Sequence, residues 1–455
     1  MDLPAGFTER MKTVLGEEFD AFIAQYDLPP VRGLRVNTLR LSKERFLELS
    51  PWKVGRSETL DEGLVLLEEA EHIGTHPYHI AGLFYMQEPS AMSVIAEAGI
   101  EPGMKVLDLC AAPGGKSGGA AARLRGKGLL VSNEIVPSRA KQLARNLERL
   151  GVTNAVVTSA HPDAVANALP GYFDRVIVDA PCSGEGMFRK DPQAIAEWSL
   201  EHVASCAVRQ RAIMESAARC VAPGGKLIYS TCTFSREENE GVIEGFLSDH
   251  PDFSPEMMRR LYPHTCTGEG HFVARLIWSG SIENIERPAK KDGRSAPVKK
   301  ERELSPVGKP LEKPVREFLS AALDGETSIL PLRVYGQKLV YCPFEYPDEL
   351  TSLPIVSFGV EVGEFTKGRL RPSHAFFMAA HGLGYRKCFD FAPDDPLLLS
   401  FLGGNTLPVS ESDAEEFSGC FCPVTVSGFA VGFGKVSDGQ LKNHLPKGLT
   451  VGSYR

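Results

Sequence analysis

Two cysteine thiols follow two different apolar segments of this chain. Cys182 lies in Asp-Ala-Pro-Cys-Ser-Gly, and Cys232 lies in Thr-Cys-Thr. The preceding runs, residues 175–178 and 226–230, are short and apolar, which predicts two buried strands. A thiolate presented at the end of a strand can attack an electrophilic carbon, so covalent catalysis is the chemistry that these two residues suggest.

A glycine-rich turn lies upstream of both thiols. Residues 108–116 have the sequence Asp-Leu-Cys-Ala-Ala-Pro-Gly-Gly-Lys and begin at the end of an apolar run, residues 105–109. In a parallel α/β sheet, ligands bind at the carboxyl ends of the strands. We therefore expect the turn and the two thiols to meet in one pocket, with the turn holding a cofactor.

Three classes of cofactor can be compared with this turn. A P-loop requires glycine five residues before Gly115, where the chain has Cys110, and residues 112–117 lack the Gly-x-Gly-x-x-Gly of a dinucleotide turn. The remaining interpretation is S-adenosylmethionine (AdoMet), whose methionine part can lie against small residues because glycine lets the backbone approach closely. The predicted cofactor residues are Cys110, Ala111, Ala112, Pro113, Gly114, Gly115 and Lys116.

An acid at the end of the second strand should hold the cofactor ribose, as in dinucleotide sites. Glu134 follows the apolar run 129–133 and lies about 20 residues beyond Gly115. A carboxylate at the start of a surface helix is the alternative interpretation of Glu134. With the turn upstream, the ribose contact is the better interpretation.

Two thiols in one pocket suit the C5 methylation of a pyrimidine. Attack of one thiolate on C6 makes C5 nucleophilic enough to accept a methyl group, and the second thiol can assist breakdown of the adduct. Asp179, three residues before Cys182, can hydrogen-bond the N3 and amino edge of a cytosine and assist its protonation. Two buried structural cysteines are the alternative, and these residues alone leave open whether Cys182 or Cys232 attacks.

The order of expected elements divides the chain into five parts. Residues 101–280 alternate strands (105–109, 129–132, 155–158, 175–178, 226–230, 272–278) with helices (138–150, 194–221, 237–247), which predicts an α/β, Rossmann-like catalytic core. Residues 1–100 form a small α+β unit with a helix at 7–22. Residues 281–312 are a basic linker, and residues 313–390 and 391–455 are two C-terminal α+β units.

Bulk properties exclude several classes of protein. The 455 residues contain ten scattered cysteines with no Cys-x-x-Cys pair, so we expect reduced thiols and no metal. No run of about 18 apolar residues predicts a membrane span, and the first residues do not resemble a secretory signal. The cytoplasm is therefore the expected location. The net charge of −8 argues against salt-driven polyanion binding over the whole surface.

The motifs together resemble those of RNA 5-methylcytosine methyltransferases of the RsmB/RsmF (sun-like) family, and most closely its bacterial RsmF branch, which modifies 16S rRNA. The resemblance covers nearly the whole chain apart from the linker. It is carried by residues 110–117, 179–192 and 229–240, by shorter matches at 35–38, 87–90, 263–264 and 268–270, and by 432–435 and 442–449, which resemble a PUA-related domain.

The resemblance implies roles for individual residues. Cys232 would attack C6 of cytosine, Cys182 would assist release, and the AdoMet site would comprise residues 110–116, Glu134 and Asp179. Many family members hold the adenine with an aspartate after the third strand; here His161 stands at that spacing and Asp163 two residues later. The expected substrate is small-subunit rRNA, naked or in the 30S particle, with a monomeric enzyme. A tRNA methyltransferase and a non-catalytic ribosome-assembly factor are the alternatives.

Basic residues near both ends of the chain are candidates for RNA contact. Arg32, Arg35 and Arg40 lie in a segment whose alternating pattern predicts a strand. They can bind phosphate, or they can belong to a solvated face of that strand. A second basic cluster comprises Lys435, Lys442, His444 and Lys447, and the nearby Phe429 and Phe433 are expected in a core. Since the cofactor residues precede residue 313, we expect removal of the residues from about 313 onward to leave AdoMet binding intact and to weaken RNA binding. The alternative is that the C-terminal part only shapes the site or packs against the core.

Overall fold

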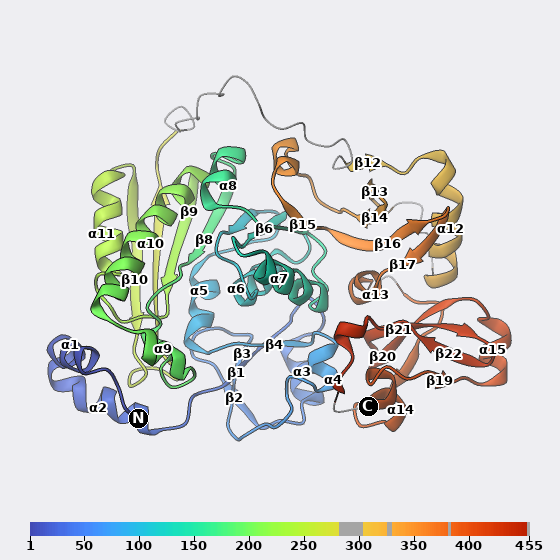
Figure 1. Cartoon of the computed structure of the whole chain (residues 1–455), viewed down its shortest axis with the longest axis horizontal. Helices are drawn as coiled ribbons and strands as arrows, with labels where there is room; N and C mark the ends of the chain where they lie inside the picture. Colours follow the sequence, from blue (N-terminus) through green and yellow to red (C-terminus); the bar gives the residue numbers. More distant parts are fainter. Residues whose placement is uncertain (282–303, 325–329, 381–383, 453–455) are drawn as a thin grey trace.

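An eight-stranded sheet forms the centre of the computed structural model, which describes residues 1–281, 304–324, 330–380 and 384–452 (Figure 1). The strand order is β10-β11-β9-β8-β5-β6-β7-β15. The middle strands β9, β8, β5, β6 and β7 are parallel, whereas β10, β11 and β15 run antiparallel to their neighbours. The bounds are β5 Lys105–Asp108, β6 Leu129–Asn133, β7 Ala155–Thr158, β8 Phe173–Asp179, β9 Val221–Thr231, β10 Phe253–Leu261, β11 His271–Trp278 and β15 Ile355–Phe358.

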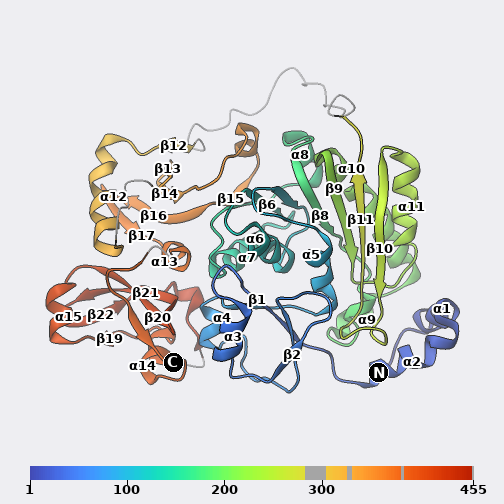
Figure 2. The same ribbon diagram turned by 180° about the vertical axis from the view of Figure 1, so that it is seen from behind.

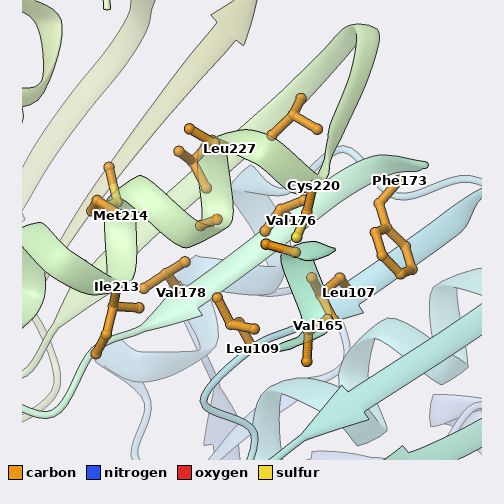
Figure 3. Packing of buried hydrophobic residues seen from close by; sticks show 14 of the residues in the cluster. Leu107, Leu109, Val165, Phe173, Val176, Val178, Ile213, Met214, Cys220 and Leu227 are labelled. Atoms are coloured by element: carbon orange, nitrogen blue, oxygen red, sulfur yellow. The ribbon is translucent and has the colours of Figure 1, made fainter. Parts of the chain in front are cut away.

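Helices cover both faces of this sheet, because successive residues of each central strand point to opposite sides. Leu107 packs with residues of α8 and α10 (Figure 3), and the same cluster includes Val131 and residues of α11. Val106 and Leu130 pack on the other face with residues of α5, α6 and α7. The helices are α5 Ser93–Glu97, α6 Gly115–Leu124, α7 Pro137–Arg149, α8 Pro162–Ala168, α10 Leu200–Cys220 and α11 Glu240–Asp249. The predicted Rossmann-like α/β core is confirmed.

One helix and one strand of the catalytic core differ from the elements expected from the sequence. The expected helix 194–221 is two helices, α9 (Pro192–Glu197) and α10, because Ser199 has extended backbone and caps α10 by accepting a hydrogen bond from His202 N. Strand β10 was not expected, since most of its side chains are exposed and its sequence lacks an apolar run.

The N-terminal unit contains two helices and a small sheet. The expected helix 7–22 is broken into α1 (Ala5–Leu15) and α2 (Phe19–Ile23), which pack on Phe188 and Trp198 of the core. The sheet has the order β2-β3-β1-β4. Its bounds are β1 Gly33–Val36, β2 Val54–Arg56, β3 Gly63–Leu66 and β4 Phe84–Met86, with α3 Lys43–Leu49 and α4 Pro77–Ile80 beside it.

Two of the three N-terminal arginines are buried, so their expected contact with RNA phosphate is wrong. Arg35 is 3% exposed, and its Nη1 donates to Gln87 Oε1 at 2.6 Å and to the carbonyl of Gly115. Arg40 is 6% exposed and donates to the carbonyl of Arg149. These side chains fix the N-terminal sheet against the glycine-rich turn and α7. Arg32 is exposed and remains available to RNA.

The C-terminal part forms two five-stranded sheets (Figure 2). The first has the order β12-β13-β14-β16-β17 and carries α12 and α13; the second has the order β18-β20-β21-β22-β19 and carries α14 and α15. The bounds are α12 Lys309–Ala322, α13 His374–Ala379, α14 Pro396–Leu402, α15 Glu411–Glu416, β12 Leu304–Pro306, β13 Leu332–Tyr335, β14 Lys338–Tyr341, β16 Val360–Thr366, β17 Arg369–Pro372, β18 Phe389–Phe391, β19 Leu407–Pro408, β20 Phe421–Val426, β21 Phe429–Ser437 and β22 Gln440–Asn443.

Among the contacts of the C-terminal part with the rest of the molecule, two involve whole sheets. Strand β15 pairs with β7, so a C-terminal segment completes the edge of the catalytic sheet. The second C-terminal sheet shares one apolar cluster with the N-terminal sheet, and Tyr78 Oη lies 3.1 Å from Ser427 Oγ.

The expected linker is shorter than predicted. Residues 304–312 belong to β12 and to the start of α12 rather than to a linker, because β12 pairs with β13. The remainder of the expected basic linker, from residue 282 to residue 303, lies outside the described residues.

Candidate functional site

The three predicted motifs open into one cavity at the carboxyl edge of the parallel strands, as expected. The glycine-rich turn follows β5, Glu134 follows β6, and Cys182 and Cys232 follow β8 and β9. The cavity has a volume of about 1350 Å³, and residues from all four segments line it. The sheet topology therefore brings together residues that lie up to about 120 positions apart in the chain.

Glycine is required in the turn after β5. Gly114 has a φ of 113°, which lies in the left-handed region, and a Cβ on it would lie 3.1 Å from Leu143 Cδ1. Helix α7 holds the turn from one side, because Asn146 Nδ2 donates to the carbonyl of Pro113 and Arg139 Nη2 donates to the carbonyl of Ala112. Glycine therefore meets two requirements at this position, a left-handed backbone and close packing of the turn against α7.

Cys110 in this turn is a third thiol that lines the cavity. Burial raises the pKa of Cys110 well above the ordinary value of a thiol. Cys110 therefore stays protonated and serves as a small wall of the cavity. Its position fits a contact with the cofactor and does not suit a nucleophile.

Glu134 lies where the sequence placed it, in the cavity wall after β6, and is 4% exposed. Its Oε1 accepts a hydrogen bond from Val136 N, and its Oε2 lies 3.4 Å from Arg139 Nη1. The carboxylate thus has a fixed orientation and still borders the cavity. A carboxylate and a backbone-lined turn in one cavity fit the ribose and methionine ends of AdoMet.

The two candidate thiols face each other. Cys182 Sγ and Cys232 Sγ are 3.3 Å apart, which is a hydrogen-bond distance for sulfur and too long for a disulfide. The hydrogen bond to Cys232 and burial raise the pKa of Cys182 well above the usual value of a thiol. Cys182 therefore retains its proton at neutral pH and can donate a hydrogen bond to the sulfur of Cys232.

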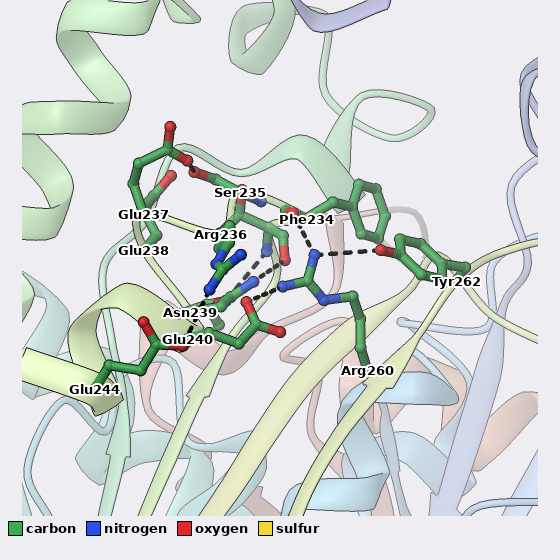
Figure 4. A network of polar contacts seen from close by, with 12 residues as sticks. Phe234, Ser235, Arg236, Glu237, Glu238, Asn239, Glu240, Glu244, Arg260 and Tyr262 are labelled. Carbon is green, nitrogen blue, oxygen red and sulfur yellow. Dashed lines mark hydrogen bonds and ion pairs between the residues drawn. The ribbon is translucent and has the colours of Figure 1, made fainter. Parts of the chain in front are cut away.

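The segment that carries Cys232 is held by residues that follow it in the chain (Figure 4). Asn239 Nδ2 donates to the carbonyl of Thr233, and Asn239 Oδ1 accepts from Thr231 Oγ1 at 2.6 Å. Arg260 donates to the carbonyl of Phe234. These contacts fix the side chain of Thr231 and the carbonyls of Thr233 and Phe234, so the fold sets the position of the Cys232 sulfur between them.

Asp179 lies between the turn and the thiols as an ionised carboxylate. Its Oδ2 is 2.7 Å from Lys116 Nζ, and its Oδ1 accepts a hydrogen bond from Ser230 Oγ at 2.8 Å. Burial would raise the pKa of Asp179, but Lys116 and His271 hold this pKa below its ordinary value. Burial would likewise lower the pKa of Lys116, but Asp179 raises it above the ordinary value.

His271 was not predicted from the sequence. It is 2% exposed at the start of β11, and its Nε2 lies 3.6 Å from Asp179 Oδ1. It directly follows the matched segment 268–270, but a histidine at the start of an apolar strand gives no local signal of a contact with Asp179. Glu185 and Glu238, described below, lie inside the matched segments 179–192 and 229–240, but they were not assigned a role because no local pattern shows that a glutamate will be buried. Gln210 lies in a helical segment outside the matched segments and was missed as well.

His161 and Asp163 both line the cavity beyond Glu134. His161 caps α8 by accepting a hydrogen bond from Asp163 N, and Asp163 Oδ1 accepts hydrogen bonds from Ser216 Oγ and Arg219 Nη2. Because Asp163 Oδ1 is already engaged twice, His161 is the less occupied of the two candidates for the adenine contact.

Two further features bear on the class of protein. Within the described residues, no group of three or more His, Cys, Asp or Glu side chains is arranged to hold a metal ion. None of the helices in the described ranges has both the length and the apolar composition that crossing a bilayer requires.

The fold and this cavity define an AdoMet-dependent methyltransferase. The family model of 16S rRNA methyltransferase RsmB/F matches residues 99–277, and models of the RsmF N-terminal domain, first C-terminal domain and PUA domain match residues 3–89, 317–379 and 388–451. The chain is 32% identical to ribosomal RNA small subunit methyltransferase F of Pectobacterium atrosepticum over 98% of this chain and 96% of that protein. The chain therefore belongs to the RsmF family of 16S rRNA methyltransferases, and AdoMet is its cofactor.

Other relatives and solved structures agree with this assignment. The same enzyme of Serratia proteamaculans is 31% identical over 98% of this chain and 96% of its own length. A methyltransferase homologue from Pyrococcus horikoshii superposes with a TM-score of 0.54 at 28% identity, over 60% of this chain and 94% of that one. NSun6 from Pyrococcus horikoshii, at 22% identity and a TM-score of 0.55, shares the fold over 61% of this chain and 99% of its own.

Proposed function

We propose that this enzyme methylates C5 of a cytosine in 16S rRNA through a covalent adduct with Cys232. The observation that carries the proposal is the pair of sulfur atoms 3.3 Å apart in the cavity that Glu134 and the glycine-rich turn also line. AdoMet supplies the methyl group when bound. A target base inside a stacked RNA cannot reach these sulfurs, so the cytosine enters the cavity flipped out of its stack.

Cys232 forms the bond to C6 in this proposal. The attack makes C5 nucleophilic, and the developing negative charge on the base must be balanced. Asp179 is ionised, so it accepts a hydrogen bond from the cytosine amino group and does not itself supply a proton. Lys116, which is 2.7 Å from Asp179, keeps this carboxylate ionised and places a positive charge beside it that offsets part of the charge developing on the base.

Cys182 acts at the end of the reaction. After C5 has lost its proton to a base, the electrons of the C5–H bond re-form the C5–C6 double bond and the C6–sulfur bond breaks. The Cys232 thiolate is then the leaving group. Its departure is favoured by the Cys182 S–H, which donates a hydrogen bond to it. The raised pKa of Cys182 keeps that proton in place at neutral pH.

The surface that binds RNA is proposed to include the C-terminal basic cluster. Lys435 lies over the ring of Phe421, beside His444, while Lys442 and Lys447 are exposed. Phe429 and Phe433 are 8% and 3% exposed and belong to the core. Because the whole chain carries −8, local basic surface is needed to attract phosphate. Since the substrate is ribosomal RNA, the cytoplasm is the proposed site of action.

The test is incubation of the protein with AdoMet labelled in the methyl group, using 16S rRNA, 30S subunits and tRNA as separate substrates. Label in 5-methylcytidine of 16S rRNA or of 30S subunits is the expected result. Label confined to tRNA would favour the alternative substrate, and AdoMet binding with no methylation would favour an assembly factor. Bisulfite sequencing of RNA from a deletion strain would locate the modified cytosine.

A further inference from the structure

Two buried glutamates connect the segments that carry the two thiols. Glu185 follows Cys182 in the chain, and its Oε2 accepts a hydrogen bond from Phe234 N at 2.7 Å, two residues beyond Cys232. Glu238 follows Cys232, and its Oε2 accepts a hydrogen bond from Ser183 N at 3.0 Å, one residue beyond Cys182. Each segment therefore supplies the carboxylate that holds the other segment.

A glutamine on α10 adds a second contact to the Cys182 segment. Gln210 Nε2 donates to the carbonyl of Pro181 at 3.1 Å and to Glu238 Oε2 at 2.8 Å. The backbone is thus bound on both sides of Cys182, at Pro181 and at Ser183. Glu185 is itself held in place, because its Oε1 accepts a hydrogen bond from Trp198 Nε1 at 3.0 Å.

The burial of these groups is too complete for a role in surface solubility. Gln210 and Glu238 are 0% exposed, and Glu185 is 2% exposed. Glu238 Oε1 and Gln210 Oε1 have no hydrogen-bond partner among the described residues. Burying unpartnered oxygen atoms costs folding free energy, and a fold retains such groups when their geometry is needed.

We propose that Glu185, Glu238 and Gln210 are positioning residues, each of which serves one of the two half-reactions. Glu238 and Gln210 hold Cys182 for release of the product, and Glu185 holds Cys232 for attack on the base. The inference rests on the proposed function above. None of the three lines the side of the sulfur pair where the base must enter; each acts on a thiol through backbone. Two direct hydrogen bonds also join the segments, since Gly186 N donates to the carbonyl of Cys232 at 2.7 Å and Ser183 Oγ lies 2.8 Å from Thr233 Oγ1. The glutamates add the contacts at Phe234 N and Ser183 N and so fix the orientation of each segment beside its thiol.

The variants follow from the hydrogen-bond pattern. Gln210→Met keeps the volume of the side chain and removes both donated hydrogen bonds. Glu238→Gln can keep its acceptor oxygen toward Ser183 N, because only Oε2 of Glu238 is engaged, and it serves as the matched control. Glu185→Gln cannot keep both contacts, since Trp198 and Phe234 occupy one oxygen each.

Single-turnover reactions with 16S rRNA or 30S subunits and labelled AdoMet separate the two effects. Gln210→Met should methylate the base but release it about tenfold more slowly, so that covalent RNA–protein complex accumulates on a denaturing gel. Glu185→Gln should form the complex about tenfold more slowly and should not accumulate it. Glu238→Gln should behave as the unmodified enzyme, and Glu238→Ala should match Gln210→Met.

Failure of this inference is distinguishable from failure of the proposed function. If the unmodified enzyme makes no 5-methylcytidine, the proposed function is wrong. If the unmodified enzyme does make 5-methylcytidine, two results contradict the division between the two half-reactions. In one, the variants form and release the covalent complex at the rates of the unmodified enzyme. In the other, all variants lose both steps equally. Titration of each variant with AdoMet, together with its melting temperature, identifies a variant that has merely unfolded, and Glu238→Gln and Gln210→Met then carry the test.

Discussion

Lys116 Nζ lies 2.7 Å from Asp179 Oδ2, and this ion pair joins the glycine-rich turn to the end of β8. The pair is shielded from water, since the Lys116 side chain is 16% exposed and that of Asp179 is 27% exposed. It links the glycine-rich turn, which is proposed to bind the cofactor, to the segment that carries Cys182. A change in either partner should therefore affect binding and chemistry together.

Replacing Lys116 should move the pH profile of the enzyme. Burial raises the pKa of Asp179 and Lys116 lowers it, so Lys116→Met should raise this pKa. Activity that needs ionised Asp179 is present above its pKa and is lost as the pH falls through it. The acidic limb of kcat/KM should therefore lie at higher pH in Lys116→Met. Lys127→Met, at an exposed lysine outside the cavity, is the control and should keep the original profile.

The two thiols should give opposite phenotypes. Cys232→Ala should abolish both methyl transfer and the covalent complex with RNA, because it removes the attacking sulfur. Cys182→Ala should still methylate, but it should trap the complex because the departing thiolate loses its hydrogen-bond donor. A denaturing gel with labelled RNA distinguishes them. Accumulation of complex in Cys232→Ala, and none in Cys182→Ala, would reverse the assignment.

Glu134→Ala should weaken AdoMet binding. Hydrogen bonds to a charged group contribute about 1.5–3 kcal/mol each, so losing the ribose contact should raise the dissociation constant by about tenfold or more. Isothermal titration measures this directly. The control is Glu68→Ala, at an exposed glutamate of the N-terminal unit, which should bind as the unmodified enzyme does. An unchanged affinity in Glu134→Ala would assign Glu134 only to its contacts with Val136 and Arg139.

Much of the core was predictable because its signals are local. Short apolar runs followed by motif residues located every parallel strand, and the topology of such sheets then placed Cys182, Cys232 and Glu134 at one edge. The predictions that were wrong concern residues whose positions depend on contacts between distant segments. Arg35 resembles an exposed strand residue, and nothing near it in sequence shows that the carbonyl of Gly115 and the side chain of Gln87 will receive its guanidinium.

The buried glutamates illustrate the same limit. Glu185 and Glu238 lie in polar segments and would be assigned to the surface from sequence, since glutamate is rarely buried without a partner. Their partners are backbone amides of a segment about 50 residues away, brought near only by the pairing of β8 with β9. A sequence contains no local signal for such a contact.

The C-terminal part also does more than the sequence indicated, and it sets the last prediction. Strand β15 (Ile355–Phe358) forms the edge of the catalytic sheet beside β7. Ser159, which lies two residues before His161, donates a backbone hydrogen bond to the carbonyl of Pro354. Leu350, Leu353 and Phe358 lie in the apolar cluster that covers one face of the catalytic sheet. The expectation that AdoMet binding is independent of the residues beyond 313 is therefore revised.

Two truncations separate the structural role from RNA binding. A chain ending at residue 312 should lose AdoMet affinity and melt at lower temperature, because the edge of β7 and part of the core are exposed. A chain ending at residue 380 keeps β15 and should still bind AdoMet, while losing Lys435, Lys442 and Lys447. Its RNA affinity should fall, and the slope of log affinity against log salt should decrease by about 1 for each lost phosphate contact. Full AdoMet affinity in the chain ending at residue 312 would show that β15 is not needed for AdoMet binding. An unchanged slope of log affinity against log salt in the chain ending at residue 380 would show that the last sheet does not anchor RNA.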